Sequence, residues 1–134
     1  MKQQQEIINA NDFEVWRDVI GYEGDYLVSD KGRVWSFKRK RFLKSSNNGK
    51  GYRIVILYKQ GKAKCVSIHR LVAQAFVVNN RPEEATEVDH KNHDRSDNRA
   101  SNLRWVTPLE NRMHRANITK IAAYNPQTGE RVGI

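Results

Sequence analysis

Membrane-spanning and secretory signals are missing from this sequence. No apolar run in its 134 residues approaches the roughly 18 that a membrane-spanning helix needs. The first residues, Met1 to Glu6, are polar and no apolar stretch follows them, so we expect neither a signal peptide nor a transit peptide. The single cysteine, Cys65, excludes a disulfide framework and a cysteine-based zinc site, and we expect it to be a small buried strand residue. These absences predict a cytoplasmic protein.

Acidic residues are missing from a long central segment. Residues 31–82 hold 14 Lys and Arg and no Asp or Glu, whereas residues 1–30 hold 2 against 7 and residues 83–134 hold 8 of each. The net charge of +9 therefore arises in the central segment. Such dense positive charge predicts a polyanionic partner. Nucleic acid is favoured over a solvated basic face or an anionic membrane. The membrane is disfavoured because no strong amphipathic helix carries the charge.

Turn signals divide the first part of the chain into short strands. Asp30-Lys31-Gly32 predicts a reversal between strands at 26–29 and 33–36, with further partner strands at 42–43 and 52–58 and another strand at 64–68. The period then changes over 69–76, where apolar residues fall on one face of a short helix. We place a module boundary near residue 80.

The second part reads as strand, polar loop, strand and helix. Residues 87–90 and 103–106 are the expected strands, and the loop at 91–102 has Ala100 as its one apolar residue. Loops of this length are commonly functional or disordered. Thr107, Pro108 and Glu110 form a capping box that predicts a helix from 108 to about 116.

This second part carries a set of chemically active side chains. Asp89 and His90 are neighbours on a strand and point to opposite faces, so a bend or bulge near His90 is needed if both serve one site. Asn111 lies one turn into the helix, and Leu109 and Met113 are expected to point elsewhere and pack. Carboxylate and amide oxygens suit Mg²⁺ or Mn²⁺, and a neutral imidazole can take a proton from water. These are the minimal parts for phosphodiester hydrolysis.

Contacts to phosphate or DNA are expected from basic side chains near this set and in the basic segment. His69 is interpreted as a hydrogen-bonded structural histidine, with DNA contact as the alternative. The expected contact residues are Arg104, His114, Arg115, Lys38, Arg39, Lys40, Arg41 and Arg70.

Two stretches resemble a known family. Val88-Asp89-His90, the polar loop, and the run from Ser101 to Asn111 resemble the HNH endonucleases with the ββα-metal fold, most of all the phage and intron-encoded homing nickases. The upstream residues Trp16, Gly21-Tyr22-Glu23-Gly24 and Gly32-Arg33-Val34 are similar to the small nuclease-associated module of such enzymes. The stretch 69–73 is similar to their linker helix, so the resemblance covers about 14–115.

The resemblance implies a role for each matching residue. Asp89 would be a metal ligand, His90 the general base, and Asn111 the second ligand, where many HNH enzymes have their final histidine. Asn102 matches the asparagine that holds the loop so that His90 is oriented. His93 stands where a glycine or small turn residue is commoner, so it distorts the loop or lends an extra imidazole.

The sequence thus predicts an α+β fold: a small antiparallel β module with one helix, followed by a ββα-metal HNH unit. We expect a basic DNA-binding module at 13–80, the nuclease unit at 81–117 and a tail or hairpin at 118–134. The expected function is a DNA endonuclease that binds one Mg²⁺ or Mn²⁺ per active site. It would act as a monomer on double-stranded DNA and nick it, in the cytoplasm of a bacterial host cell if phage-encoded. The alternative is a non-catalytic DNA- or RNA-binding module on the same scaffold.

Overall fold

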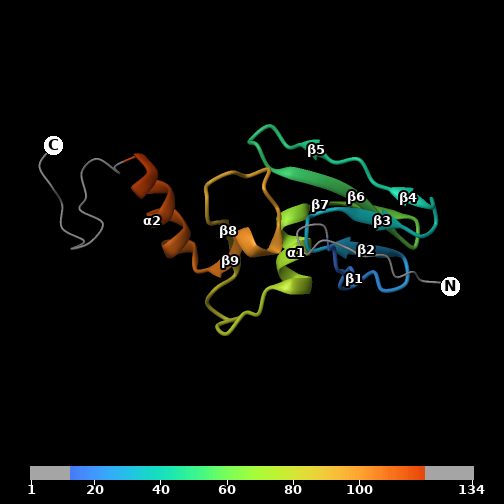
Figure 1. The fold of residues 1–134 in the computed structure, drawn as a ribbon, viewed down its shortest axis with the longest axis horizontal. Coiled ribbons are helices and arrows are strands. Elements are labelled where there is room, and N and C mark those ends of the chain that lie inside the picture. Colours follow the sequence, from blue (N-terminus) through green and yellow to red (C-terminus); the bar gives the residue numbers. More distant parts are fainter. Residues whose placement is uncertain (1–12, 120–134) are drawn as a thin grey trace, which may run out of the picture.

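A computed structural model describes residues 13–119 of the chain and shows short strands around two helices (Figure 1). The tail expected at 118–134 lies almost entirely outside the described residues. The elements are β1 (Trp16–Asp18), β2 (Tyr26–Ser29), β3 (Val34–Ser36), β4 (Arg41–Phe42), β5 (Ser46–Asn47), β6 (Arg53–Lys59), β7 (Lys62–Ser67), α1 (Ile68–Phe76), β8 (Glu87–His90), a 3₁₀ turn η2 (Ala100–Asn102), β9 (Leu103–Val106) and α2 (Pro108–Thr119).

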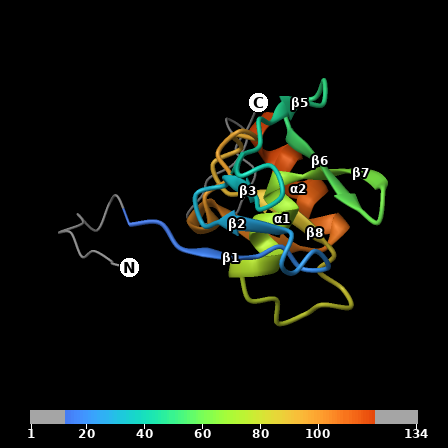
Figure 2. The same cartoon turned by 90° about the vertical axis from the view of Figure 1, so that its right-hand side faces the viewer.

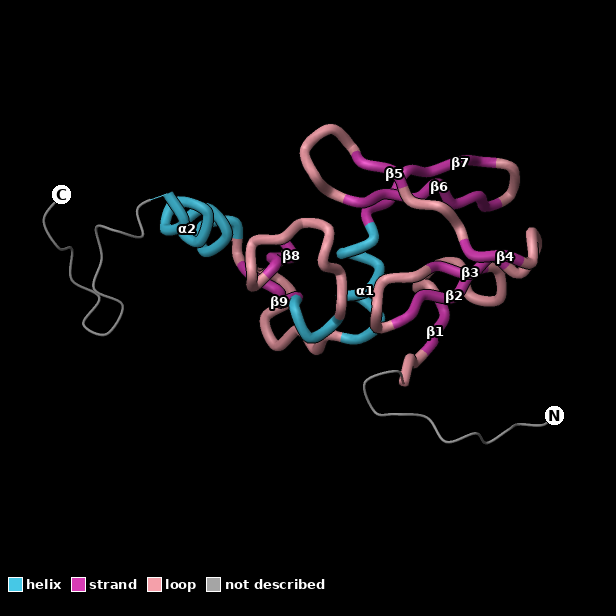
Figure 3. The backbone as a smooth tube through the Cα atoms, turned by 45° about the horizontal axis from the view of Figure 1, so that its top comes forward, coloured by secondary structure: helices cyan, strands magenta, loops and turns pink. Residues whose placement is uncertain are grey.

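The strands form three separate antiparallel sheets, β1-β2-β3-β4, β5-β6-β7 and β8-β9 (Figure 3). The predicted α+β class and the hairpin at 26–36 are confirmed. The expected pairing of the strand at 52–58 with that hairpin is wrong. The turn at 48–52 folds β6 back on β5, and β7 takes its other edge. The first two sheets are instead joined where the Tyr58 backbone N–H donates to the Tyr26 hydroxyl at 3.0 Å.

Helix α1 lies at the centre of the hydrophobic core. Its buried residues are Ile68, Leu71, Val72 and Ala73, and the helix contacts β2, β6, β7, β8 and β9 (Figures 1 and 2). One apolar cluster takes side chains from all three sheets, so the core is continuous across residue 80. The module boundary near residue 80 stays a prediction.

The outer face of the β5-β6-β7 sheet is exposed, and this corrects the expectation for Cys65. Cys65 is exposed and faces Ile56 across the ladder, and Ile56 is exposed as well. Side chains alternate along a strand, and here Val55 and its partner Val66 take the inward positions. A period of two assigns the faces of β7 but does not tell which of them is buried.

The second part folds as strand, loop, strand and capped helix, as predicted. Thr107 Oγ1 accepts from the Glu110 backbone N–H at 3.0 Å, and Glu110 Oε1 accepts from the Thr107 N–H at 2.9 Å, so the capping box is confirmed. Leu109 and Met113 do not pack as expected, because each is 56% exposed. Helix α2 extends away from the sheets (Figure 1), so the described residues leave more than half of each of these two side chains open.

Candidate active site

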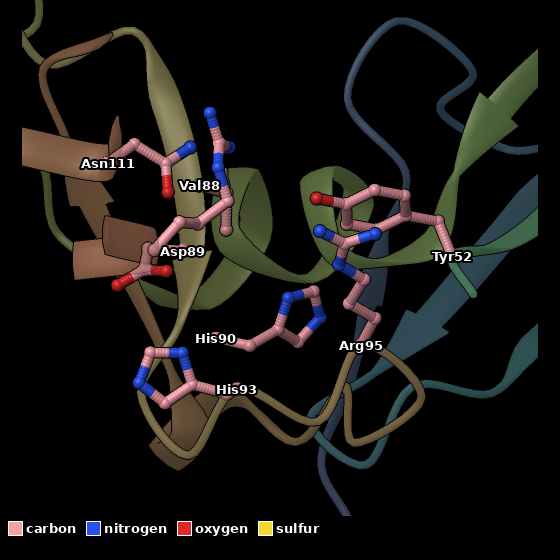
Figure 4. A pocket seen from close by; sticks show the side chains of 8 residues that line it. Tyr52, Val88, Asp89, His90, His93, Arg95 and Asn111 are labelled. Carbon is pink, nitrogen blue, oxygen red and sulfur yellow. The ribbon is translucent and has the colours of Figure 1, made fainter. Parts of the chain in front are cut away.

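A cavity of about 370 Å³ opens between the β8-β9-α2 unit and the start of β6 (Figure 4). Strand β8 supplies three lining residues, the following loop two, and helix α2 two. Tyr52, just ahead of β6, closes the other side. The lining residues are Tyr52, Val88, Asp89, His90, His93, Arg95, Asn111 and Arg115. The fold therefore brings Asp89, His90, Asn111 and Arg115 together.

Asp89 and His90 reach this cavity without the bulge that the sequence suggested. Each residue of β8 pairs with one residue of β9, and the pairing stays regular to the end of the strand, where Asp89 pairs with Arg104 and His90 with Leu103. The two side chains diverge as a regular strand requires, and each points into a different part of the cavity (Figure 4). The expectation of a bulge is therefore wrong, because the cavity is wide enough to receive both faces of the strand end.

Asp89 is a buried carboxylate with a cationic partner. Its side chain is 7% exposed, and its Oδ2 accepts from Arg104 Nε at 2.9 Å. The Nδ1 of His114 lies 2.8 Å from the same oxygen, but the two atoms are not aligned for a hydrogen bond. A buried carboxylate needs such partners, since an unpaired charge in the interior is costly. No hydrogen bond in residues 13–119 involves Asp89 Oδ1.

Asn111 is held with its oxygen facing Asp89. Its Nδ2 donates to Glu87 Oε1 at 2.8 Å. Since a carboxylate accepts only, this bond fixes the amide so that Oδ1 points the other way, toward Asp89 (Figure 4). Two oxygen atoms, one from Asp89 and one from Asn111, therefore face the same space. This donor set fits a hard divalent cation.

The protein itself supplies few further ligands. Among the described residues no group of three or more His, Cys, Asp or Glu is arranged to hold a metal ion. A cation held by two oxygens keeps most of its coordination sphere for water and phosphate, which is typical of Mg²⁺ sites that act on phosphates.

His90 is buried, and its ring edge is fixed by a hydrogen bond. His90 Nε2 lies 2.7 Å from Asn98 Oδ1 in the polar loop. The ring of His69, from α1, lies 5.0 Å from the His90 ring, and Tyr52 stacks on His69 at 5.1 Å. Burial, and then the neighbouring His90 and Arg70, lower the pKa of His69 from 6.5 to about 4.

His69 is not the hydrogen-bonded residue that was expected. Its Nδ1 is buried and has no hydrogen-bond partner in the described part of the chain. Its contacts are ring contacts with Tyr52 and His90 instead. Sequence spacing did not suggest these, because the three residues come from three different elements.

Asn102 organises the polar loop from within. Its Nδ2 donates to Asn92 Oδ1 and to the Asp97 backbone carbonyl, both at 2.9 Å, and its Oδ1 accepts from the Asn92 N–H at 3.2 Å. Asn102 is buried. The loop is thus ordered by its own hydrogen bonds, and Asn102 acts on His90 only through the loop backbone.

His93 has the backbone conformation of the glycine that is commoner at its position. Its φ is +66°, in the left-handed region. Its ring stacks on that of His114 with centroids 3.8 Å apart, beside Asp89. Burial, and then the neighbouring His114, lower the pKa of His93.

The expected phosphate-contact residues lie in two places, some in or near the β8-β9-α2 unit and the others in the basic run at 38–41. In the first place, Arg104 is paired with Asp89. Arg70 Nη1 donates to the Thr86 carbonyl at 2.9 Å, and the Arg70 guanidinium lies 5.5 Å from the centre of the Trp105 ring. The basic run at 38–41 lies between β3 and β4, at the opposite end of the molecule from α2 (Figures 1 and 3). Two hollows adjoin that run, one lined by Lys38 and Arg39 and one by Arg39 and Arg41.

Four residues at the site were not found from the sequence: Tyr52, Glu87, Arg95 and Asn98. Arg95 Nη1 donates to the Lys50 carbonyl at 2.7 Å and its guanidinium lies 4.6 Å from the centre of the Tyr52 ring, which ties the loop to the β5–β6 turn. Asn98 is one of several asparagines in a polar tract, and nothing in its sequence context distinguishes it. Glu87 alone carried a signal, because it lies two residues before Asp89 on the same regular strand, which places the two side chains on one face.

Comparison with known proteins gives two family matches. Residues 14–58 match the NUMOD4 motif and residues 66–113 match the HNH endonuclease family.

No helix within residues 13–119 is both long and apolar enough to cross a membrane.

Similar sequences come from viruses. The chain is 42% identical over 106 residues to the DNA endonuclease I-HmuI of Bacillus phage SP01, which covers 77% of this chain and 60% of that protein. It is 41% identical over 103 residues to the uncharacterized HNH endonuclease L247 of Acanthamoeba polyphaga mimivirus, covering 75% and 26%. It is 34% identical over 95 residues to the H-N-H endonuclease F-TflII of Escherichia phage T5, covering 71% and 49%. The chain thus spans less than two thirds of the length of each.

One solved structure is similar in fold. It describes DNA binding and cleavage by the HNH homing endonuclease I-HmuI. The TM-score is 0.67 at 39% identity, and the match covers 81% of this chain and 66% of that one.

Proposed function

This chain belongs to the HNH endonucleases, with a NUMOD4 module ahead of its nuclease unit, and from that membership we propose that it is a metal-dependent DNA endonuclease that nicks one strand. The observation that carries the proposal is the cavity where buried Asp89, His90 and Asn111 meet. An oxygen pair and an imidazole on opposite sides of one space are what metal-assisted hydrolysis of a phosphodiester requires.

In the proposed reaction His90 is the general base. Its ring takes a proton from a water molecule, the water oxygen forms a bond to phosphorus, and one P–O ester bond breaks. The leaving oxygen then takes up a proton from solvent. Arg115, which lines the same cavity, holds a flanking phosphate, and His114 is a second candidate for that role.

Asp89 and Asn111 hold the divalent cation, through the Asp89 carboxylate and Asn111 Oδ1. When bound, the ion supplies positive charge beside the scissile phosphate and the leaving oxygen. We propose one ion per site, Mg²⁺ or Mn²⁺, because both cations favour oxygen ligands. Asn102 keeps the loop beside them in place.

Duplex DNA is the proposed substrate, bound by a monomer. The contacts would come from the basic segment, above all Lys38, Arg39, Lys40 and Arg41, with further contributions from Arg70 and Arg104. One active site cuts one strand, so a monomer nicks. We further propose a homing-type role, in the cytoplasm of a bacterial host cell if the chain is phage-encoded.

A plasmid assay tests the core of this proposal. Supercoiled DNA is incubated with the wild type, His90→Ala or Asn111→Ala in Mg²⁺, in Mn²⁺ and in EDTA. We expect the wild type to give open circles in metal only and both variants to fall at least about 100-fold in rate. Leu109→Ala, an exposed change on the same helix as Asn111, is the matched control and should cut normally.

Two results would contradict the proposal. If both variants cut like the wild type, the site is elsewhere. If DNA is bound in EDTA and no metal supports cleavage, the chain is a binding module; competition between duplex DNA and RNA then identifies its ligand.

A further inference from the structure

The hydrogen bond between His90 and Asn98 determines which nitrogen of His90 is free. The Asn98 side-chain oxygen can only accept, so a neutral His90 must donate from Nε2, 2.7 Å away. The lone pair is then on Nδ1. No hydrogen bond within residues 13–119 involves His90 Nδ1, and Figure 4 shows a nitrogen of this ring turned toward the interior of the cavity.

Asn98 is in turn held by the N-terminal module. The reversal between β2 and β3 ends at Gly32, whose φ is +90°. A Cβ atom there would lie 3.1 Å from Asn98 Cβ and 3.3 Å from the Asn98 carbonyl oxygen, so a larger residue would push Asn98 away by a few tenths of an ångström as well as strain the backbone. Two residues further on, the Ala100 N–H donates to the Asp30 carbonyl at 2.8 Å.

A second contact, from His69 of helix α1, restrains the His90 ring. His69 lies 5.0 Å away, tilted by 49°, and the Tyr52 ring that stacks on His69 is itself tied to the loop by Arg95. His90 is therefore held at one edge by Asn98 and at one face by His69.

We propose that Asn98 is a positioning residue for the hydrolysis proposed above: it holds His90 in the tautomer whose Nδ1 can accept the proton from water. The Asp30–Gly32 reversal of the NUMOD4 module holds Asn98 in place, so that module is a structural part of the nuclease site as well as a DNA-binding unit. The inference rests on the proposed function only for its catalytic consequence.

Asn98 differs from Asn102 in how it acts. Asn102 bonds to the loop at Asn92 and Asp97, whereas Asn98 touches the His90 ring itself. Removal of the Asn102 amide is expected to loosen the loop as a whole. Removal of the Asn98 acceptor changes one ring.

The tautomer of His90 is measured by the ¹⁵N shifts of its imidazole in the full chain without metal. Asn98→Leu keeps the branched shape of the side chain and removes the acceptor, and Asn98→Asp keeps an acceptor oxygen. We expect a single Nε2–H tautomer in the wild type and in Asn98→Asp, and a mixture in Asn98→Leu. Ser96→Ala, which removes only a side-chain bond to Asp94 in the same loop, is the control and should match the wild type.

The kinetic arm uses the plasmid assay. Asn98→Leu should lower kcat by about 10- to 100-fold with KM changed less than about twofold, because the base is misdirected while DNA contacts are intact. Asn98→Asp should recover part of that activity. Gly32→Ala, made in the other module, should also give a mixed tautomer and a lower kcat.

The two arms separate the possible failures. A wild-type His90 with its proton on Nδ1, or an Asn98→Leu protein with one Nε2–H tautomer and normal kcat, overturns the inference. A wild type that cuts no DNA in any metal, with the tautomer changing as expected, overturns the proposed function and leaves the positioning of the ring supported.

Discussion

Removing the Glu87 carboxylate tests whether the orientation of Asn111 matters. Glu87→Ala deletes the acceptor of the 2.8 Å bond from Asn111 Nδ2. A hydrogen bond to a charged group contributes about 1.5–3 kcal/mol. Without this hydrogen bond the Asn111 amide can rotate and present its NH₂ group to the cation. The partial positive charge of the NH₂ group repels the cation. At about 1.4 kcal/mol per tenfold, the expected decrease in metal affinity is roughly 10- to 100-fold.

The assay is plasmid nicking over a range of Mg²⁺ concentrations. Glu87→Ala should need roughly 10- to 100-fold more Mg²⁺ for half-maximal rate, with the maximal rate partly recovered at saturation. Glu87→Gln retains an acceptor oxygen and removes the charge, so it separates orientation from electrostatic attraction and should lie near the wild type.

A second background sharpens the test. Asn111→Asp places an oxygen at both positions of the head group, so either orientation presents an oxygen to the cation, but the new carboxylate cannot donate to Glu87 and is repelled by it. Glu87→Ala should therefore no longer raise the Mg²⁺ requirement in the Asn111→Asp background, and relief of the repulsion should lower it. The reasoning is refuted if Glu87→Ala has the Mg²⁺ requirement of the wild type, or if Glu87→Gln is as impaired as Glu87→Ala.

Three further predictions concern stability and DNA binding. His93→Gly should raise the free energy of unfolding by about 0.5 kcal/mol, because glycine adopts φ +66° without strain; a urea midpoint that falls would contradict this. The fold should become less stable as the pH drops from 6.5 toward 4, since the unfolded chain protonates His69 and the folded one, with a pKa of about 4, does not; His69→Phe should flatten this part of the pH profile, and an unchanged slope would argue against it. Changing the four basic residues at 38–41 to Gln should lower the salt dependence of DNA binding by up to about 0.9 in log–log slope for each phosphate that the run neutralises. The same change at exposed Lys62 and Lys64 tests whether the run contributes more than the rest of the basic segment, and a wild-type slope in the 38–41 variant would show that the run does not bind phosphate.

Local signals in the chain were sufficient for most elements. The capping box at Thr107 and Glu110 starts α2 through bonds between residues three apart, and Gly32 allows the β2–β3 reversal through its own φ. The sheet to which each strand belongs was not determined by such local interactions. The strand predicted at 52–58 was placed with the wrong partners, because the choice among strand edges depends on which edge is free after the chain has turned back on itself.

The site shows the same division. Asp89, His90, Asn102 and Asn111 were predicted from their spacing and from the family resemblance, and the fold brings three of them to one cavity. Asn98 was not found, because a buried asparagine and an exposed one look alike within a polar loop. The exposure of Leu109 and Met113 was not predicted for a related reason. The sequence of a helix does not indicate whether another element covers its apolar residues.

The sequence by itself determined the order of elements, the concentration of positive charge in residues 31–82 and the identity of the groups that can bind a cation or take a proton. These depend on residue type and on neighbours a few positions away. Only the tertiary structure decided that the Asn111 oxygen faces Asp89, that Asn98 fixes the edge of His90, and that Gly32 of the first module lies against the loop of the second. Gly32 and Asn98 are distant in sequence, and so are Asp89 and Asn111, whereas His90 and Asn98 are eight residues apart within an irregular loop. How the core packs around α1 brings these residues together, and no local pattern encodes that packing.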